Sequence, residues 1–398
     1  MKVVLAPAPV RGFRLAGVSA GLKTQAGAKD LGLIAAERPC PAAAVFSANQ
    51  VRAAPVYATI DRIRAGRLQA IVANSGCANS FTGKPGLKLA EASCAAVAEA
   101  LGCSPRLVAP SSTGVIGHLY DLAKFRAGVR EAAHALSEDG LEDFARAIMT
   151  TDTRPKMAST SLRLGGAKVT IAGAVKGVGM ISPHMATMLG YVLTDAAASS
   201  AELRDALKAA LPGSFNAITV DGDMSTNDTV IVMASGAAEN RPLRGRDLEA
   251  FNRAIAAICA ALARELVADG EGATKLVTVE VRGARTSADA ERCARQIANS
   301  PLVKTAFFGC DPNVGRILMA AGSSGAAVQP DRLVLSIGGI RVAARGALLI
   351  AALGAAQEKM RAREFDVTLD LRLGAARKTI LTCDLSYDYV RINAEYTT

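Results

Sequence analysis

The chain has 398 residues, which is enough for two or three domains with a sizeable hydrophobic core. Hydrophobic residues make up 50% of it and charged residues 21%, a composition that excludes intrinsic disorder. No apolar run reaches the roughly eighteen residues that a transmembrane helix needs, and the first residues lack a signal-peptide pattern, so we expect a cytoplasmic protein without a membrane partner.

The net charge of +10 leaves nucleic-acid binding open as a function of a different class. Lysine and arginine are spread along the chain, however, and aromatic residues make up only 4%, so platforms for stacked bases are not expected. A positive potential that attracts small anionic substrates is the simpler interpretation. Eight scattered cysteines without a C-x-x-C pair, and only three histidines, predict reduced thiols and neither a metal site nor a cofactor.

The first quarter of the chain predicts strands, a loop and a helix. Residues 3–35 alternate apolar and small residues with glycine breaks, which indicates short strands and turns. The run LQAIVA at 68–73 predicts a buried strand, and the turn-rich segment 74–83 follows it. Apolar residues at helical spacing predict a helix over 87–101 that ends before a glycine.

The next segment, 106–117, reads RLVAPSSTGVIG and predicts a strand that opens into a loop of serine, threonine and glycine. Acyl transfer needs hydrogen-bond donors aimed at the developing oxyanion. Thr113 offers a hydroxyl and Gly114 a backbone N–H for that purpose. From the residues alone, an ordinary Ser/Thr turn is the alternative.

Residues 121–149 predict two helices with a break near 137–140. The hydroxyl-rich run TTDT, beginning at Thr150, comes directly after them. Such a cluster suits hydrogen bonds to a polar ligand, although helix termination alone also explains it. Two strands are then predicted over 158–164 and 168–174.

The stretch from Lys176 to Asp195, KGVGMISPHMATMLGYVLTD, looks most like a reacting centre. Its lysine can bind a substrate carboxylate as a point charge. The hydroxyl of Thr187 can attack the carbonyl of Ala186 and cut the chain between them. Thr187 would then be N-terminal, and its own α-amine, with an unperturbed pKa of about 7.7–8.0, would be the base for its hydroxyl. The alternative is a glycine-rich turn before a buried strand.

The second half of the chain predicts helices over 198–211 and 247–268. The acidic run DGDMSTNDT at 221–229 fails as a calcium loop because its sixth position is not glycine. Glu271 lies in the loop DGEGATK, where a carboxylate can pair with an α-ammonium group, although a surface carboxylate is the usual explanation. A separate C-terminal domain is predicted from Lys275.

Several of these motifs together resemble the ornithine acetyltransferase (glutamate N-acetyltransferase) family of arginine biosynthesis. The family segment KG-x-GMI-x-PNMATML, with TDA after the next strand, is matched except at His184, where the family usually has asparagine. The NSG-x-AN, Thr-Gly, TTDT, DGD-x-STNDT, DGEGATK and G-x-DPN-x-GRI segments are matched as well, from Asn74 to Thr398. We interpret His184 as a neutral hydrogen-bonding replacement; a general base is the alternative.

The resemblance implies an α/β fold (mixed α+β), with a layered sheet core of the ornithine acetyltransferase or DmpA-like type and a smaller C-terminal α/β domain. It implies a catalytic domain over 1–274 and a domain over 275–398 that completes the substrate pocket. Self-cleavage would divide the chain into an alpha chain, 1–186, and a beta chain, 187–398. Two copies of each are expected to form a heterotetramer.

The resemblance also implies a role for each matched residue. Thr187 would carry an acetyl group from N-acetyl-L-ornithine to L-glutamate in a ping-pong reaction, with Thr113 and Gly114 as the oxyanion hole. No cofactor is expected, and acetyl-CoA as a further acetyl donor is left open. An autoproteolytic aminopeptidase or amidase, which releases the acyl group to water, is the alternative within this chemistry. The residues implied to bind the amino-acid substrates are Thr150, Lys176, Thr187, Glu271, Asn393 and Thr398, and Asp223 and Asn227 are implied to support the site.

Overall fold

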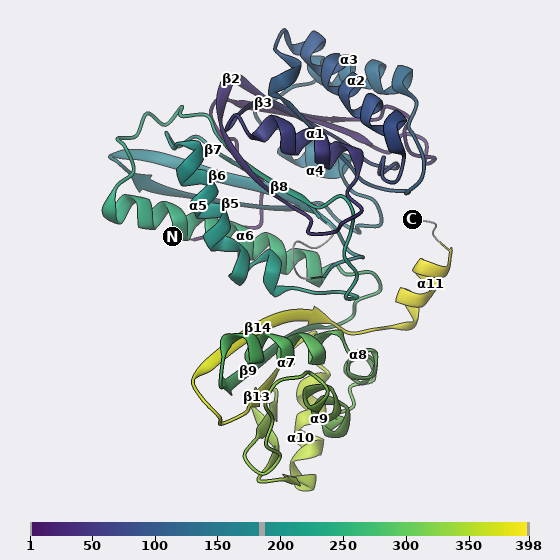
Figure 1. Cartoon of the computed structure of the whole chain (residues 1–398), viewed down its shortest axis with the longest axis vertical. Helices are drawn as coiled ribbons and strands as arrows, with labels where there is room; N and C mark the ends of the chain where they lie inside the picture. The colour runs from purple at the N-terminus through teal and green to yellow at the C-terminus, as the bar shows by residue number, and fades with distance from the viewer. Residues whose placement is uncertain (1, 183–187, 396–398) are drawn as a thin grey trace. The chain divides into compact units, whose positions relative to one another are not determined.

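The computed structural model describes residues 2–182 and 188–395. Within them the chain forms two compact units (Figure 1). The larger unit runs to Asn216 and resumes from Met224 to Leu266. The smaller unit takes Ala217–Asp223 and continues from Val267. Each unit has its own sheet and its own core, and each is described by itself below.

The sheet of the larger unit has, among the described residues, eight strands. Strand β1 pairs with β2 outside the main path. The order along that path is β4(Val108–Ser112), β3(Arg67–Asn74), β2(Leu31–Phe46), β8(Thr229–Ala234), β7(Leu189–Thr194), β6(Ala167–Lys176) and β5(Lys156–Leu164), and β1 spans Phe13–Val18.

Strand β2 joins the two halves of this sheet. Its first part pairs antiparallel with β3, and its last part, Ala42–Phe46, pairs antiparallel with β8. Between them the register with β3 shifts from Ala35 to Cys40. Pro39 lies in this irregular segment, where a residue without a backbone N–H leaves no ladder hydrogen bond unmade. The strand can therefore change partners part-way along.

Six α-helices accompany the sheet within the described part of the larger unit. Helix α1 packs on β4, α3 on β2, α4 on β1 and β2, and α5 on β2, while α2 packs on α3. The α5 helix begins with a capping box, in which the Ser199 hydroxyl and the Glu202 carboxylate each accept a backbone N–H. The bounds are α1(Ala54–Ile63), α2(Gly83–Leu101), α3(Leu122–His134), α4(Leu141–Ala147), α5(Ser200–Ala210) and α6(Gly245–Ala268).

Four neighbouring strands begin or end side by side at one end of the sheet. The start of β5 lies beside the end of β6, since Lys156 is paired with Val175. The end of β6 lies beside the start of β7, since Lys176 is paired with Leu189. Leu189 is in turn paired with Thr229 at the start of the parallel strand β8. Loops that leave these strands therefore begin side by side.

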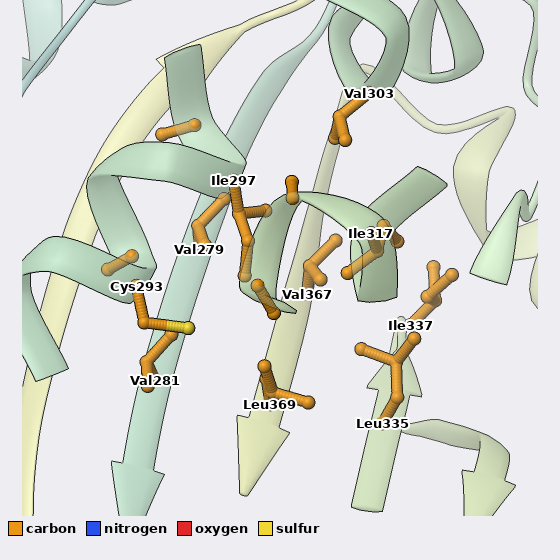
Figure 2. Packing of buried hydrophobic residues seen from close by; sticks show 14 of the residues in the cluster. Val279, Val281, Cys293, Ile297, Val303, Ile317, Leu335, Ile337, Val367 and Leu369 are labelled. Carbon is orange, nitrogen blue, oxygen red and sulfur yellow. The ribbon is translucent and has the colours of Figure 1, made fainter. Parts of the chain in front are cut away.

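The smaller unit has a second sheet, of six strands among the described residues, with helices α7 to α11. Figure 2 shows Val279 and Val281 of β9 close to Cys293 and Ile297 of α7 in its hydrophobic core. The strand order is β12(Ala347–Leu348), β11(Ile340–Ala344), β10(Val334–Ile337), β13(Glu364–Asp370), β9(Leu276–Ala284) and β14(Ala376–Cys383). The helices are α7(Ser287–Asn299), α8(Pro301–Phe308), α9(Val314–Gly322), α10(Leu353–Met360) and α11(Tyr387–Glu395).

The predicted fold class, mixed α/β with layered sheets and a smaller C-terminal α/β part, is confirmed. The helix predicted over 87–101 is α2, which ends at Leu101 with Gly102 in the left-handed conformation. Only short strands were predicted over residues 3–35, whereas β2 begins at Leu31 and continues to Phe46. The domain boundary at residue 275 stays a prediction.

The aromatic pair of Phe144 and Tyr191 tests the core of the larger unit. Phe144 is fully buried, and its ring meets that of Tyr191 edge to face with centroids 5.0 Å apart. Because Phe144→Ala removes this contact and leaves a cavity, we expect it to lower the free energy of unfolding by about 3–5 kcal/mol. Urea denaturation measures the change. Leu87→Ala, at an exposed position of α2, is the control, and an equal loss there would contradict the assignment.

Candidate active site

The buried amine of Lys176 brings two predicted site residues together at the sheet edge. Its Nζ lies 3.1 Å from Oγ1 of Thr113 and 2.9 Å from Oγ1 of Thr150, and donates a hydrogen bond to each. Lys176 is the last residue of β6, Thr113 follows β4, and Thr150 follows α4. A cation and two hydroxyls from separate elements therefore meet within hydrogen-bond distance.

The backbone at Gly114 requires glycine. Its φ is +124°, and a Cβ at this position would lie 2.4 Å from the carbonyl carbon of Gly76. The neighbouring amides are used: Thr113 donates its N–H to Asn74 O, and Val115 donates its N–H to Gly76 O. The Gly114 N–H donates to no other residue that the structure describes. Thr113 thus presents a hydroxyl and Gly114 an N–H.

The carboxylate of Asp152 ties three segments of the site together. It accepts hydrogen bonds from Lys156 Nζ at 2.6 Å, from Gly177 N–H at 2.9 Å and from Thr150 N–H at 3.0 Å. Burial alone would raise the pKa of Asp152, but the positive charges of Lys156 and Lys176, with the hydrogen bonds, outweigh it and lower the pKa to about 2. Asp152 is therefore ionised under ordinary conditions and fixes Thr150 beside Lys176.

A buried amide network holds the loops after β3 and β4. The Asn227 amide donates to Ala78 O and to Ser112 O, both at 2.8 Å. Ser112 also donates its hydroxyl to Asn74 Oδ1, and Asn74 donates its amide to Cys77 O. Since Ser112 immediately precedes Thr113, this network fixes the point at which the loop with Thr113 and Gly114 begins.

Asp228 is a buried acid that the sequence analysis missed. Met188, the residue after Thr187 in the chain, donates its N–H to Asp228 Oδ1 at 3.1 Å. Within the described residues, Asp228 Oδ2 has no hydrogen-bond partner. Burial raises the pKa of Asp228 well above its usual value, although the Met188 N–H opposes the shift. An aspartate directly before a strand that is apolar after its first residue, as in ND-TVIVMA, was the available signal.

Cys77 lies in the same loops but lacks the environment of a nucleophile. Its thiol is buried and donates to the carbonyl of His118 at 3.1 Å. Burial raises the pKa of the Cys77 thiol, which disfavours the reactive thiolate. The structure therefore indicates that Cys77 is a structural thiol rather than a nucleophile.

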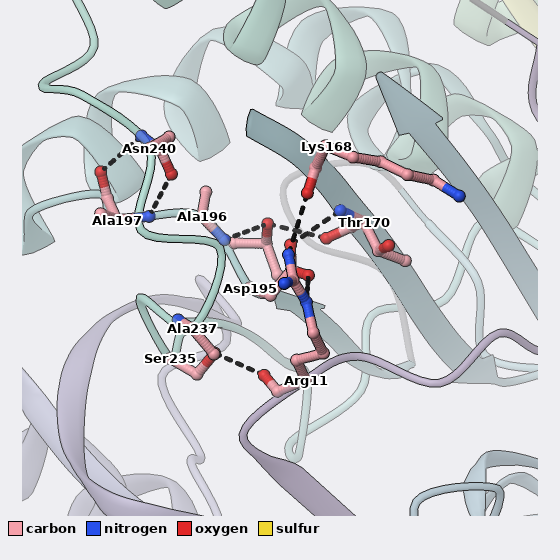
Figure 3. Close-up of polar contacts among 10 residues, drawn as sticks. Arg11, Lys168, Thr170, Asp195, Ala196, Ala197, Ser235, Ala237 and Asn240 are labelled. Atoms are coloured by element: carbon pink, nitrogen blue, oxygen red, sulfur yellow. Dashed lines mark hydrogen bonds and ion pairs between the residues drawn. The ribbon is translucent and has the colours of Figure 1, made fainter. Parts of the chain in front are cut away.

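The TDA motif at the other end of β7 is structural. Figure 3 shows the Asp195 carboxylate between Arg11, whose Nε donates at 2.8 Å, and the N–H of Thr170, which donates at 2.7 Å. Arg11 also donates to Lys168 O. The Thr194 hydroxyl bonds Thr170 O and the N–H of Ala196. These contacts anchor the N-terminal segment to the end of β7. The start of β7, which follows Thr187 in the chain, lies at the opposite end of the strand.

The smaller unit brings together two other predicted residues. Asn393 of α11 donates its amide to Glu271 Oε2 at 2.8 Å, and Glu271 is buried. The residue after Glu271 has to be glycine, because a Cβ on Gly272, at φ +66°, would lie 2.5 Å from the backbone nitrogen of Tyr389. The glycine after Glu271 therefore lets α11 approach the carboxylate closely.

The remaining predicted residues are distributed as follows. Asp223 is exposed in the smaller unit, whereas Asn227 is buried in the larger one. The described residues contain no group of three side chains suited to hold a metal ion. No helix in the described part of the chain is long and apolar enough to cross a membrane. The positions that fall outside the described residues are His184, Ala186, Thr187 and Thr398.

Comparisons with known proteins identify the relatives of this chain. A sequence profile of the ArgJ family matches residues 14–398. The arginine biosynthesis bifunctional protein ArgJ of Symbiobacterium thermophilum is 49% identical, covering 99% of this chain and 98% of its own. That of Geobacter sulfurreducens is 48% identical, covering 98% and 100%. The crystal structure of ArgJ from Bacillus halodurans matches with 43% identity and a TM-score of 0.51, covering 53% of this chain and all of its own.

The Asp152 carboxylate predicts a pH dependence of stability. Its pKa of about 2 in the folded chain lies below the ordinary value of 3.8. The folded state therefore gains stability above pH 4, and this gain, about 2 kcal/mol, is lost as the pH falls towards 2. Unfolding measured between pH 7 and pH 2 tests it: Asp152→Asn should remove this part of the acid sensitivity.

At neutral pH the same variant should lose about 3–5 kcal/mol, because it leaves Lys156 buried without its carboxylate. Asp139→Asn, at an exposed position, is the control. A neutral effect of Asp152→Asn would show that the carboxylate does not hold the site together.

Proposed function

The chain belongs to the ArgJ family and is an acyltransferase of arginine biosynthesis, and on this premise we propose that it transfers an acetyl group from N-acetyl-L-ornithine to L-glutamate. The observation that carries the proposal is the pairing of a buried cation with oxyanion donors. Lys176 contacts the hydroxyls of Thr113 and Thr150, and the adjacent Gly114 N–H is unused among the described residues. Acyl transfer needs donors for the developing oxyanion, and a cation beside them can bind the carboxylate of an amino-acid substrate.

The nucleophile of the proposed reaction is Thr187, made N-terminal by cleavage after Ala186. Its α-amine takes the hydroxyl proton while the oxygen attacks the acetyl carbonyl. The Thr113 hydroxyl and the Gly114 N–H stabilise the oxyanion that forms. The C–N bond then breaks, the α-amine returns the proton to the leaving nitrogen, and ornithine departs from an acetyl-threonine ester.

The second half of the proposed reaction reverses these steps. The neutral α-amine of glutamate attacks the ester carbonyl, and the same two donors stabilise the second oxyanion. Collapse breaks the C–O bond and returns the hydroxyl to Thr187, while the proton lost by glutamate passes through the α-amine of Thr187. N-acetyl-L-glutamate leaves. The single nucleophile serves both halves, which is why ping-pong kinetics are expected.

Both substrates share an α-carboxylate and the carbon that carries the reacting nitrogen. We assign the carboxylate to Lys176, with Thr150 beside it, because a compact ammonium group binds carboxylates well. Glu271 and Asn393, paired within the smaller unit, are assigned to substrate binding, and Thr398 is assigned by family resemblance alone. Asp228 is assigned to holding the Met188 amide in place.

The family assignment favours transfer to an amino acid over the aminopeptidase or amidase alternative and over nucleic-acid binding. Assembly as two alpha and two beta chains, action in the cytoplasm and the absence of a cofactor stay predictions, and the use of acetyl-CoA as a further donor stays open. Incubation with N-acetyl-L-ornithine, with and without glutamate, separates the enzymatic alternatives. A transferase forms N-acetyl-L-glutamate, whereas a hydrolase forms acetate at the same rate in both.

Replacement of the nucleophile tests the mechanism directly. Thr187→Ala should abolish both chain cleavage and acetyl transfer, because it removes the hydroxyl that both reactions need. A denaturing intact-mass spectrum reads cleavage, and the acetyl-transfer assay reads activity. Thr187→Ser, which keeps a hydroxyl, should retain cleavage at a reduced rate. Cleavage that persists in Thr187→Ala would overturn the assignment of Thr187.

Replacement of Lys176 tests substrate binding. Because Lys176→Met removes a charged hydrogen bond to the carboxylate, we expect kcat/KM for both substrates to fall roughly 10- to 100-fold, mainly through KM. Lys168→Met is the control, since Lys168 is an exposed lysine of the same strand. Steady-state kinetics on fully cleaved protein measure the change. An unchanged KM with a lower kcat would contradict the proposed role.

A further inference from the structure

The sheet of the smaller unit places several arginines at one of its ends. Strand β10 runs antiparallel to both of its neighbours, and Val334 at its start is paired with Ala344 on one side and Asp370 on the other. These two residues end β11 and β13. The start of one strand and the ends of two others therefore lie at the same level of the sheet. Chain segments that are far apart in the sequence are brought together there.

Three arginines and one aspartate occupy this end, and a fourth arginine, from nearer the start of β11, lines the same cavity. Arg332 precedes β10, Arg345 directly follows β11, and Arg372 comes just after β13. With Arg341 of β11 and Asp331, they line a cavity of about 490 Å³. This volume lies within the range of about 300–1,000 Å³ that is typical of sites for small molecules. We call this cavity the arginine pocket.

The charges of the arginine pocket are not neutralised by neighbouring acids. The four guanidinium groups make no ion pair or hydrogen bond with other residues that the structure describes. Asp331 is the single acid among the described lining residues, and it pairs with none of them. The nearby Asp370 carboxylate is already engaged, since it pairs with Arg282 at 3.3 Å and accepts the Arg372 N–H. The pocket therefore keeps a strong local positive charge.

Two of these arginines occupy backbone positions that disfavour them. Arg345 and Gly346 form the two-residue connection between β11 and β12, with φ of +54° and +72°. Hairpin turns of this kind favour Asn-Gly or Asp-Gly, because φ is positive at both positions. Arg372 also has a positive φ, of +53°. An arginine in this region costs about 1–2 kcal/mol more than glycine. The chain thus accepts strain at two places that put guanidinium groups into one pocket.

We propose that the arginine pocket binds a small molecule that carries phosphate groups. Guanidinium groups match phosphate oxygens with paired hydrogen bonds, and several of them around one cavity suit a ligand with more than one phosphate. A nucleoside diphosphate, a nucleoside triphosphate and inorganic pyrophosphate all carry linked phosphate groups of this kind. The described lining residues include no aromatic side chain, so stacking of nucleic-acid bases is not part of the site.

Isothermal titration calorimetry of the full, self-cleaved protein with inorganic pyrophosphate tests the proposal. The pair Arg345→Asn and Arg372→Asn removes two guanidinium groups, and asparagine tolerates positive φ well, so folding should be kept. Arg361→Asn with Arg363→Asn is the matched control, because it removes the same charge from exposed positions before the start of β13, whereas the pocket lies at its end. Acetyl transfer should be unchanged in both pairs, which shows that the catalytic machinery is intact.

Pyrophosphate should bind, and its Kd should rise about tenfold or more for each pocket arginine removed, because each supplies charged hydrogen bonds. The control pair should keep the Kd within about twofold, since distant exposed charges are screened by salt. Arg341→Gln, a change within a strand, provides a second variant with the same expected loss.

Three results would overturn the proposal. The first is no heat of binding at millimolar pyrophosphate at low salt. The second is an equal loss of affinity in the control pair, which would mean attraction by overall charge rather than by the pocket. The third is salt-sensitive binding of RNA through the same arginines without binding of pyrophosphate, which would mark the surface as a nucleic-acid site.

Discussion

The carboxylate of Asp152 joins its chain neighbours Thr150 and Lys156 to Gly177 just after β6, and the site of the larger unit depends on that junction. Lys156 begins β5, Gly177 follows β6, and Thr150 lies in the segment after α4. A buried carboxylate is costly unless it is paired and fully hydrogen-bonded, so these three donors are a condition for its burial. Once they are in place, Thr150 is held beside Lys176. Fold stability and site geometry thus rest on the same interaction.

The part of the site that contains Thr113 and Gly114, the proposed oxyanion donors, is held by close backbone contact rather than by charge. Gly114 lies against Gly76 at a distance that admits no Cβ, and the buried Asn227 amide clamps the segments on either side. Donors fixed in this way need no reorganisation when charge develops in a transition state, which is the main source of their catalytic value. This explains why the loop after β4 is joined to the loop after β3 by so many buried hydrogen bonds.

The sequence was sufficient for local structure and for motifs, but not for partnerships across long distances. Periodicity predicted α2 with its terminal Gly102, and the two helices α3 and α4. It did not predict that β2 continues to Phe46, because its register shift and its change of partner are set by β3 and β8. Asp228 was missed for a related reason. Its contact with Met188 spans forty residues, and no local pattern records it.

The family motifs also include residues whose contacts are structural, and the structure identifies them. Asp195 of the TDA motif accepts hydrogen bonds from Arg11 and from the Thr170 N–H, and these contacts explain an aspartate here without a catalytic role. The structure shows where some of the positive charges lie. One is the buried amine of Lys176, and others are the guanidinium groups of the arginine pocket, beside the start of β10 and the ends of β11 and β13. Stacked bases would need exposed aromatic platforms, and the described lining of that pocket has none. A few guanidinium groups around one cavity suit a small anion, whereas the phosphates of a polymer need a continuous basic surface.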